Sequence, residues 1–297
     1  MTASRVSEKY NRASLEGMLD NYLEALIAHD PVRLPLSRTV KHTENTIEIP
    51  VGEGVWATAS DSATYRLDIC DPQAGQAGFF GLMKENGFPI LISARLKTEK
   101  GLVTEIETIV VRGGERPIPT ENLIKPKQVY LEALSPSERV PREEMIRISN
   151  LYFDGLVQDN GDIVPWGDEC NRLENGMQTT NNPDVQLPGS SFNPLSLGCR
   201  EQMNSKMFAY ISEIKPRRYT VIDEERGITF GTFMFHHAGT VKSVEVPGVG
   251  EVEMIPAARR PFTVAVSELF KIKSGKIEQI EAIMTSLPYH AKSGWDD

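Results

Sequence analysis

The sequence has few cysteines and no long apolar run. Its three cysteines are odd in number and widely spaced, and none forms a CxxC pair, so the sequence supports neither a disulfide framework nor a thiolate zinc site. No segment approaches the ~18 uninterrupted apolar residues of a transmembrane helix. Residues 1–14 also lack the apolar core of a secretory signal. We therefore expect a protein of the reducing cytoplasm with no membrane partner.

An excess of basic residues is also missing. The chain has 32 lysines and arginines against 41 aspartates and glutamates, which gives a formal net charge of -9. Nucleic-acid binding depends on a basic surface, and so does attraction to anionic membranes. The charge balance therefore argues against both partners and is typical of a soluble protein.

The common cofactor motifs are absent as well. The sequence contains no GxGxxG after an expected strand, no GxxxxGK[ST] and no HExxH. His236 and His237 are adjacent, and adjacent side chains of a strand point to opposite faces, so the two cannot ligate one metal without a bulge. We expect no required metal and no organic cofactor. What remains is acid/base chemistry by His, Asp, Glu, Tyr and Arg side chains.

What the sequence does contain is an internal repeat. Its 297 residues, 40% of them hydrophobic, suffice for two ordinary globular domains. When residues 21–26 are placed over residues 151–156, the HTEN segment 42–45 falls on the RLEN segment 172–175. At a second offset, residues 92–110 align with residues 267–284. Two collinear matches make coincidence improbable, so we infer a duplicated module.

The repeat predicts the domain organisation. We expect module 1 in residues 1–113, a proline-rich linker in 114–141 that acts as a spacer, and module 2 with a C-terminal tail in 142–297. Each copy begins with an amphipathic helix, at 14–29 and 144–157. Strands follow in each copy, expected at 64–70, 77–84, 89–98 and 103–112, and at 218–223, 228–237, 262–273 and 277–284. A helix and a long antiparallel sheet must bury their apolar faces against each other, which leaves a cone with an open mouth.

Several segments resemble the NTF2-like (SnoaL-like) superfamily of cone-shaped α+β domains. They are the helix that ends in AHDP, the HTEN…GEGVW segment, the hairpin RLKTEKGLVTEIETIV, and the later ELFKIKSGKIEQIEAIM and SLPYHAKSGW. The resemblance implies the fold class α+β, with two tandem NTF2-like cone-shaped α+β barrel modules. The superfamily includes ketosteroid isomerase, scytalone dehydratase, limonene epoxide hydrolase, polyketide cyclases and purely binding members. Among its double-module members, the chain is similar to the aryl-dimer γ-formaldehyde lyases.

That similarity implies a cofactor-independent lyase with a small hydroxylated aromatic substrate. In its most specific form, the reaction removes formaldehyde from a lignin-derived aryl dimer. It needs a base for a primary hydroxyl, an acid for a departing benzylic oxygen and a donor for a phenolate. An isomerase, dehydratase or cyclase of polyketide type would use the same groups. A non-catalytic binding protein is the third alternative, and a homo-oligomer is compatible with the sequence.

Candidate catalytic residues gather in the second copy. Glu268 shares its strand phase with Val264, Val266, Phe270 and Ile272, and burial among them would raise the pKa of its carboxyl. A structural ion pair with Arg172 or Arg218 is the alternative. Copy one has Ala94 at the corresponding position, so we expect the second copy to carry more of the catalysis. The full catalytic set is Glu268, His236, His237, Arg172 and Glu174.

The candidate substrate-binding residues are spread over both copies. They are His42, Tyr65, Arg95, Tyr219 and Phe235. Each has a structural alternative, because an aromatic side chain can simply fill a core and Arg95 can pair with Glu107. Glu44 and Glu174, like Glu107 and Glu281, recur in both copies, which favours a role in the scaffold.

Overall fold

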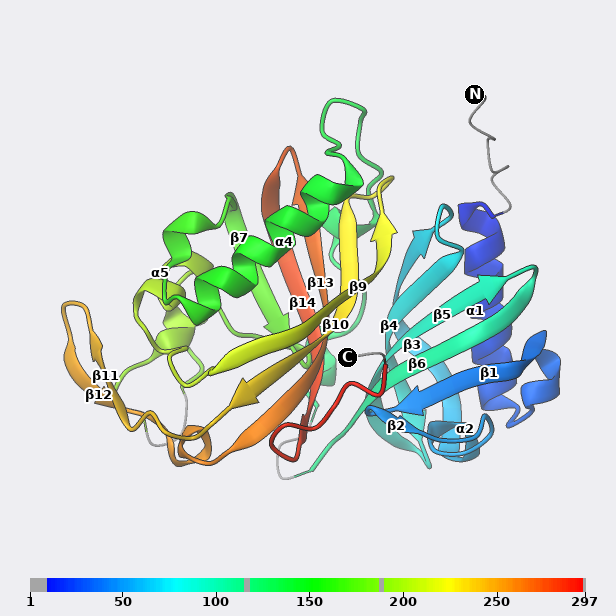
Figure 1. Cartoon of the computed structure of the whole chain (residues 1–297), viewed down its shortest axis with the longest axis horizontal. Helices are drawn as coiled ribbons and strands as arrows, with labels where there is room; N and C mark the ends of the chain where they lie inside the picture. The colour runs from blue at the N-terminus through cyan, green and yellow to red at the C-terminus, as the bar shows by residue number, and fades with distance from the viewer. Residues whose placement is uncertain (1–9, 115–117, 187–189, 296–297) are drawn as a thin grey trace.

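The computed structural model describes residues 10–114, 118–186 and 190–295, and it consists of two modules of the same design (Figure 1). Each module is a helix packed on a six-stranded mixed sheet. The strand order is β2-β1-β6-β5-β4-β3 in module 1 and β8-β7-β14-β13-β10-β9 in module 2. The two orders are equivalent, strand for strand. The predicted α+β class with two tandem modules is therefore confirmed.

The elements of module 1 fall close to the expected ranges. They are α1 Arg12–Ile27, β1 Leu36–Glu44, β2 Ile47–Glu48, α2 Val55–Thr58, β3 Ala59–Asp71, β4 Gln76–Glu85, β5 Phe88–Glu99 and β6 Leu102–Arg112, with a 3-10 turn at Pro31–Arg33. Helix α1 begins at a capping box, in which the Asn11 side chain and Ser14 satisfy each other's backbone N–H groups. Its apolar stripe packs on β3 and β4.

Module 2 repeats this order and adds loop structure. Its elements are α4 Arg142–Val157, β7 Trp166–Glu174, β8 Met177–Gln178, α5 Cys199–Asn204, β9 Glu213–Asp223, β10 Ile228–His237, β13 Phe262–Lys273 and β14 Lys276–Leu287. The 3-10 turn at Gly161–Ile163 matches the one at Pro31–Arg33. The additions are 3-10 turns at Pro194–Ser196 and Pro256–Arg259, and the hairpin of β11 Ser243–Val246 and β12 Gly250–Glu253. Figure 1 shows this hairpin at the end of module 2 that lies away from module 1.

The matching residues of the repeat occupy matching places. Asn45 and Asn175 both have a positive φ, of 49° and 47°. The Asn45 amide exchanges two hydrogen bonds with the backbone of Val110, at 3.0 and 2.8 Å, and Asn175 does the same with Met284 at the same two distances. The hairpin turns at Lys100-Gly101 and Ser274-Gly275 also match, with positive φ at all four residues.

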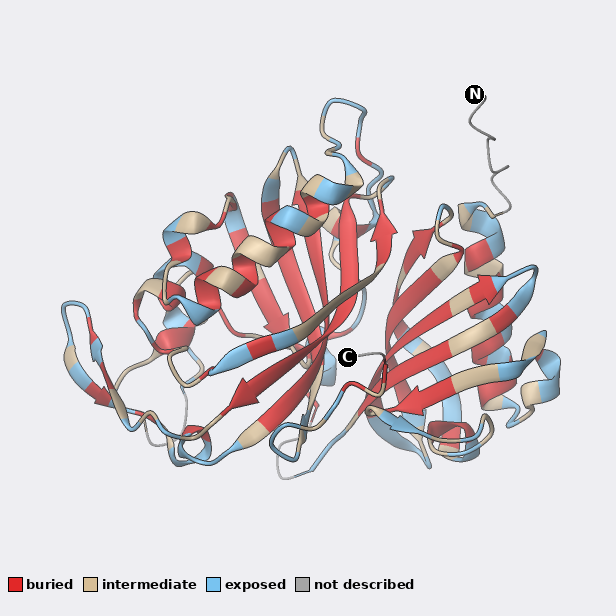
Figure 2. Cartoon of the chain, in the orientation of Figure 1, coloured by how far each residue is buried: buried red, intermediate tan, exposed pale blue. Residues whose placement is uncertain are grey.

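The two sheets pack back to back. An apolar cluster with members from both modules lies between them, including Leu67, Phe80, Val221 and Phe230. Figure 2 shows the facing strands buried along most of their length. Ser93 and Ser267, which correspond in the repeat, meet at 2.5 Å between their hydroxyl oxygens. The contact of a residue with its own equivalent marks a pseudo-twofold axis, so the chain is folded as a pseudo-dimer.

Two buried aspartates at the edge of the interface also make equivalent contacts, each with the other module. Asp223 accepts from the Cys70 backbone N–H at 3.2 Å and from Arg12 at 2.6 Å. Asp71 likewise accepts from the Ile222 backbone N–H at 3.0 Å and pairs with Arg142. Each module therefore binds the end of the other module's edge strand through a carboxylate. An arginine at the start of a helix pairs with each of these carboxylates.

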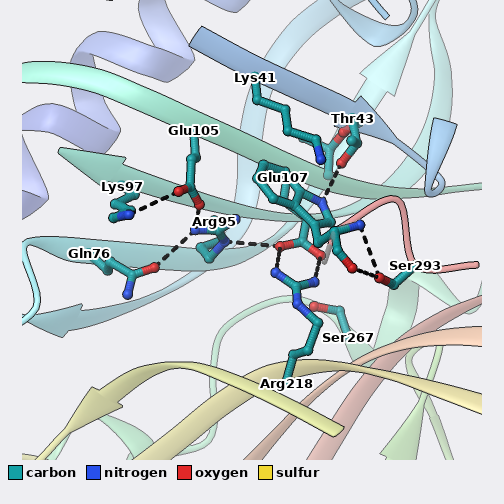
Figure 3. A network of polar contacts seen from close by, with 12 residues as sticks. Lys41, Thr43, Gln76, Arg95, Lys97, Glu105, Glu107, Arg218, Ser267 and Ser293 are labelled. Carbon is teal, nitrogen blue, oxygen red and sulfur yellow. Dashed lines mark hydrogen bonds and ion pairs between the residues drawn. The ribbon is translucent and has the colours of Figure 1, made fainter. Parts of the chain in front are cut away.

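A polar network closes the interface (Figure 3). Glu107 pairs with Arg95 at 3.0 Å and with Arg218 of the other module at 2.8 Å. Trp295 of the C-terminal tail lies over both guanidinium groups, and its indole N–H donates to Thr43 at 3.0 Å. The tail of module 2 thus packs on module 1.

The segment between the modules is more than the expected spacer. It holds a 3-10 turn at Thr120–Asn122 and the short helix α3 Gln128–Leu131. Tyr130 is fully buried and, with Ile118 and Leu123, joins the apolar cluster between the sheets. A spacer would leave these side chains in water, so this interpretation was wrong. Among the described residues, no helix combines the length and apolar character needed to cross a membrane.

Separating the modules should therefore expose a large apolar surface. We expect halves produced by cutting within residues 113–141 to be insoluble or to associate with each other. Gel filtration of each half and of their mixture measures this. If the two halves are instead soluble monomers that do not associate when mixed, the pseudo-dimer is not the folding unit.

Candidate active site

A cavity of about 250 Å³ lies inside the cone of module 2. Helix α4 contributes Tyr152, and β7 contributes Arg172 and Glu174. Glu268 on β13 and His237 on β10 complete the polar lining. The rest of the wall is apolar, and consists of Leu156, Phe208, Tyr210, Ile211, Phe235, Phe262, Val264, Val266 and Met284. A mostly apolar cavity with a few convergent polar groups is the usual form of a small-molecule site.

Glu268 is the most perturbed acid of this cavity. Its side chain is 2% exposed, and Val264, Val266, Phe270 and Ile272 of the same strand belong to the apolar core, as its strand phase predicted. Burial raises the pKa of its carboxyl to about 8, while the charge of Arg172 and a hydrogen bond from Tyr152 act in the lowering direction. Its Oε2 has no hydrogen-bond partner among the described residues. The carboxyl is therefore protonated at neutral pH.

Arg172 and Glu174 form the charged pair of the site. The Arg172 Nε lies 2.8 Å from Glu174 Oε1 and 3.1 Å from the Thr179 hydroxyl. Its Nη2 donates to Gln202 of α5 at 2.6 Å, and its Nη1 donates to the Tyr152 hydroxyl at 3.2 Å. The guanidinium is thus fixed on four sides while Glu174 remains partly open to the cavity. The alternative pairings proposed for Glu268 do not form, because Arg172 binds Glu174 and Arg218 binds Glu107.

His237 is held between two rings. It stacks on Phe262 with 4.1 Å between ring centroids and faces Tyr210 at 5.2 Å. Burial lowers the pKa of the imidazole to about 4, and Nδ1 has no hydrogen-bond partner among the described residues. A neutral imidazole with a free ring nitrogen can accept a proton.

A second cavity, of about 270 Å³, shares one wall with the first. Both are lined by Arg172, Glu174, Phe208, Tyr210 and Phe262. The far wall comes from the segments that module 2 has in addition, and includes Pro194, Leu195, Met207, Met254 and Ala258. The inserted loops therefore extend the cone rather than close it.

The other predicted site residues lie elsewhere. His236 points away from His237 and contacts the Thr263 hydroxyl at 2.8 Å and the Lys215 carbonyl at 2.9 Å. Tyr219 packs between α4 and the sheet and bonds to Asn150. His42 is buried in module 1, with Nδ1 3.3 Å from the Pro50 carbonyl oxygen, and burial lowers its pKa. Of the five candidate binding residues, Phe235 alone lines the cavity that holds Glu268.

Tyr65 and Arg95 belong to the interface between the modules. The Tyr65 hydroxyl lies 2.8 Å from both carboxylate oxygens of Glu281, and Arg95 pairs with Glu107. The pair of Arg95 with Glu107 was the structural alternative from the sequence. The recurring Glu107 and Glu281 accordingly act in the scaffold, as their recurrence favoured.

The equivalent residues of module 1 can be compared directly with this site. Glu44, the equivalent of Glu174, accepts from the Val55 backbone N–H at 2.6 Å and from Arg112 at 2.9 Å. Ala94 stands where Glu268 does, and the cone is filled by packed rings, with Tyr22 and Trp56 5.4 Å apart. Glu174 and Glu268 line a cavity in module 2. At the equivalent positions of module 1, Glu44 is bound within the scaffold and Ala94 is apolar.

Four aromatic lining residues, Tyr152, Phe208, Tyr210 and Phe262, were not predicted as site residues from the sequence. Tyr152 lies on the apolar stripe of its helix, where a hydroxyl is itself a signal because it needs a buried partner. Phe208 and Tyr210 belong to an irregular segment, and Phe262 begins a strand next to one. No periodic pattern identifies those three. Among the described residues, no group of three or more His, Cys, Asp or Glu side chains is placed to hold a metal ion.

The model of a domain family of unknown function, DUF8021, matches residues 138–284, which span most of module 2. No curated protein sequence matches the chain.

Three solved structures are similar. An NTF2-like protein of unknown function from Cytophaga hutchinsonii has 12% identity and a TM-score of 0.27, over 35% of this chain and 94% of that one. A protein from Silicibacter provisionally named a polyketide cyclase has 19% identity and a TM-score of 0.25, over 33% and 88%. A Bacillus subtilis protein provisionally named an isomerase has 9% identity and a TM-score of 0.30, over 48% and 87%.

The buried Glu268 should make stability depend on pH. Its pKa is raised in the folded state, so its contribution is complete below the unfolded value near ~4.3 and is lost as pH rises through about 8. We expect Glu268→Gln to melt at an increasingly higher temperature than the native protein between pH 5 and 8, because the amide mimics the protonated acid. The difference should grow by at most ~1.4 kcal/mol per pH unit. Melting curves at several pH values measure this, and parallel curves would contradict a buried neutral acid.

Proposed function

We propose that module 2 is a cofactor-independent acid–base enzyme for a small hydroxylated aromatic molecule. The observation that carries the proposal is the opposite perturbation of two groups on one cavity, with a pKa of about 8 for Glu268 and about 4 for His237. Burial of both groups is the main cause. Near neutral pH the cavity therefore holds a proton donor and a proton acceptor together.

Each group has a role in this proposal. The His237 imidazole accepts a proton from a substrate hydroxyl, and the Glu268 carboxyl donates one to the leaving oxygen. Arg172, fixed by Glu174 and Gln202, offers N–H groups to developing negative charge. Phe208, Tyr210, Phe235 and Phe262 supply the flat apolar walls that suit an aryl ring.

The most specific reaction we propose is formaldehyde elimination from an aryl dimer that carries a γ-hydroxymethyl group. Removal of the hydroxyl proton by His237 allows the carbon–carbon bond to break and formaldehyde to leave. The electron pair moves toward the benzylic carbon and expels its oxygen substituent, which Glu268 protonates. This assignment rests on the family resemblance, while the acid–base pair rests on the geometry.

The same pair also serves an isomerase, dehydratase or cyclase of polyketide type. Such reactions need one proton removed and another delivered within the same apolar cavity. Turnover of a hydroxylated polyketide-like compound without formaldehyde would favour this second function. Saturable binding of either compound without turnover would leave a binding protein.

Replacing the proton donor tests the proposal. We expect Glu268→Gln to keep its fold and to lower turnover ~10²–10⁴-fold, because the amide cannot donate a proton to the leaving oxygen. Formaldehyde release from the aryl dimer is the assay, and a melting curve checks the fold. Glu281→Gln is the matched control, since Glu281 is also fully buried with a raised pKa of about 7 but lies between the modules.

His42→Ala is a second control, in module 1. Both control variants should stay within a few-fold of the native rate if they fold. A folded, active Glu268→Gln beside a folded, inactive His42→Ala would place the reaction in the other module.

The pH dependence provides a further test. Turnover should rise as His237 loses its proton near pH 4 and fall as Glu268 loses its proton near pH 8. In Glu268→Gln, the residual activity should lose the alkaline limb and keep the acid limb. A rate that rises through pH 8 in the native enzyme would assign Glu268 as a base and overturn the proposed roles of both groups.

A further inference from the structure

Two cysteines that are far apart in the sequence meet in module 2. Cys170 lies on β7, and Cys199 is the first residue of α5. Their Sγ atoms are 3.8 Å apart, and the Cys199 Sγ is 3.5 Å from the Cys170 carbonyl oxygen. The third cysteine, Cys70, is packed in the core of module 1. Spacing along the chain does not indicate this pair, because it depends on how α5 packs against the sheet.

Both cysteines border a hollow in the surface, although each is buried, with 6% and 4% of its surface exposed. The hollow is polar, has a volume of about 310 Å³ and is also lined by Trp166, Asp168, Asn181 and Glu201. A water molecule needs only ~10–15 Å³ of such space, so the hollow has room for a molecule of similar size beside the two residues. The hollow is separate from the cavity that holds Glu268, since the two have no lining residue in common.

The two cysteines also lie on the two elements that fix Arg172. Strand β7 carries Arg172 itself, and α5 carries Gln202, which accepts from Arg172 Nη2 at 2.6 Å. The Gln202 amide also donates to the Pro194 carbonyl oxygen at 2.8 Å and so holds the inserted loop. A bond between the sulfurs would join these elements covalently. It requires the sulfurs to close from 3.8 Å to ~2.05 Å, a small shift of α5 toward β7.

The electrostatics favour reaction at Cys199. The hydrogen bond between the two thiols lowers the pKa of Cys199 and the nearby charge of Arg172 acts in the same direction, while burial opposes both. The thiolate is the reactive form of cysteine, and a neighbouring thiol resolves its first oxidation product. Reversible disulfides in reducing compartments are usually redox-sensing or catalytic.

We propose that Cys170 and Cys199 form a site of reversible oxidation, where hydrogen peroxide joins them in a disulfide that ties α5 to β7. The Cys199 thiolate attacks one peroxide oxygen, the O–O bond breaks, and uptake of a proton leaves a sulfenic acid and one water. The Cys170 thiol then attacks that sulfur, forms the S–S bond and releases a second water. Two electrons pass from the sulfurs to the peroxide. The proposal is independent of the reaction assigned to Glu268.

Peptide mapping tests this in the full-length protein. Trypsin cleaves after Arg147, Arg172 and Arg200, so the two cysteines fall in separate peptides, 148–172 and 173–200. After treatment with hydrogen peroxide and alkylation of free thiols, these peptides should be recovered as one linked species. Dithiothreitol should restore both free peptides. Amide exchange of α5 should be slower in the oxidised protein, because the helix is then fixed to the sheet.

Serine variants provide the controls. Cys199→Ser should abolish the linked species, whereas Cys70→Ser should leave its yield unchanged. Melting curves confirm that each variant is folded. Two fully alkylated peptides after peroxide treatment of the native protein would overturn the proposal. A sulfinic acid at Cys199 without any linked peptide would overturn it equally.

Discussion

The back-to-back packing of the two sheets is the constraint on which the rest of the structure depends. Each sheet has a helix on one face and the other sheet on its second face, so strands such as β5 and β13 are buried on both sides. Polar side chains that point to the shared face must find partners there. Ser93 meets Ser267, and Glu107 meets two arginines. The concave faces are then the parts of the sheets left to form cavities.

The two modules show how one scaffold can support a site in a single copy. The strand order and the asparagine contacts are the same in both. In module 1, however, Glu44 is tied by a backbone N–H and by Arg112. In module 2, Glu174 has Arg172 in place of these partners and faces the cavity. The inserted loops add the second cavity. The linings of the two cones therefore differ because of three changes: the partners of one glutamate, the exchange of alanine for Glu268, and the insertions.

The duplication, strand ranges and hairpin turns were predictable because they depend on local periodicity. The position of Glu268 on the concave face was predictable for the same reason, since strand side chains alternate. Alternation also sets Arg95 on the face opposite Ala94, and the apolar residues on both faces of residues 91–97 predict that a second sheet covers that face. The sequence could not show which of His236 and His237 faces the cone. Strand β10 is buried along its whole length, so it has no exposed polar face that would set the orientation of the two side chains. Phe208 and Tyr210 come from an irregular segment, and long-range packing alone places them.

The ionisation states of the site depend on the burial of two groups of opposite type. Burial disfavours the charged form of each, so it raises the pKa of the Glu268 acid and lowers that of the His237 base. An exposed pair would hold the opposite states at neutral pH, with the carboxylate ionised and the imidazole partly charged. Arg172 does not undo this effect, because its charge is already balanced by Glu174 at 2.8 Å. The carboxyl at position 174, which recurs from the scaffold of module 1, thus acts in module 2 by keeping the arginine from ionising Glu268.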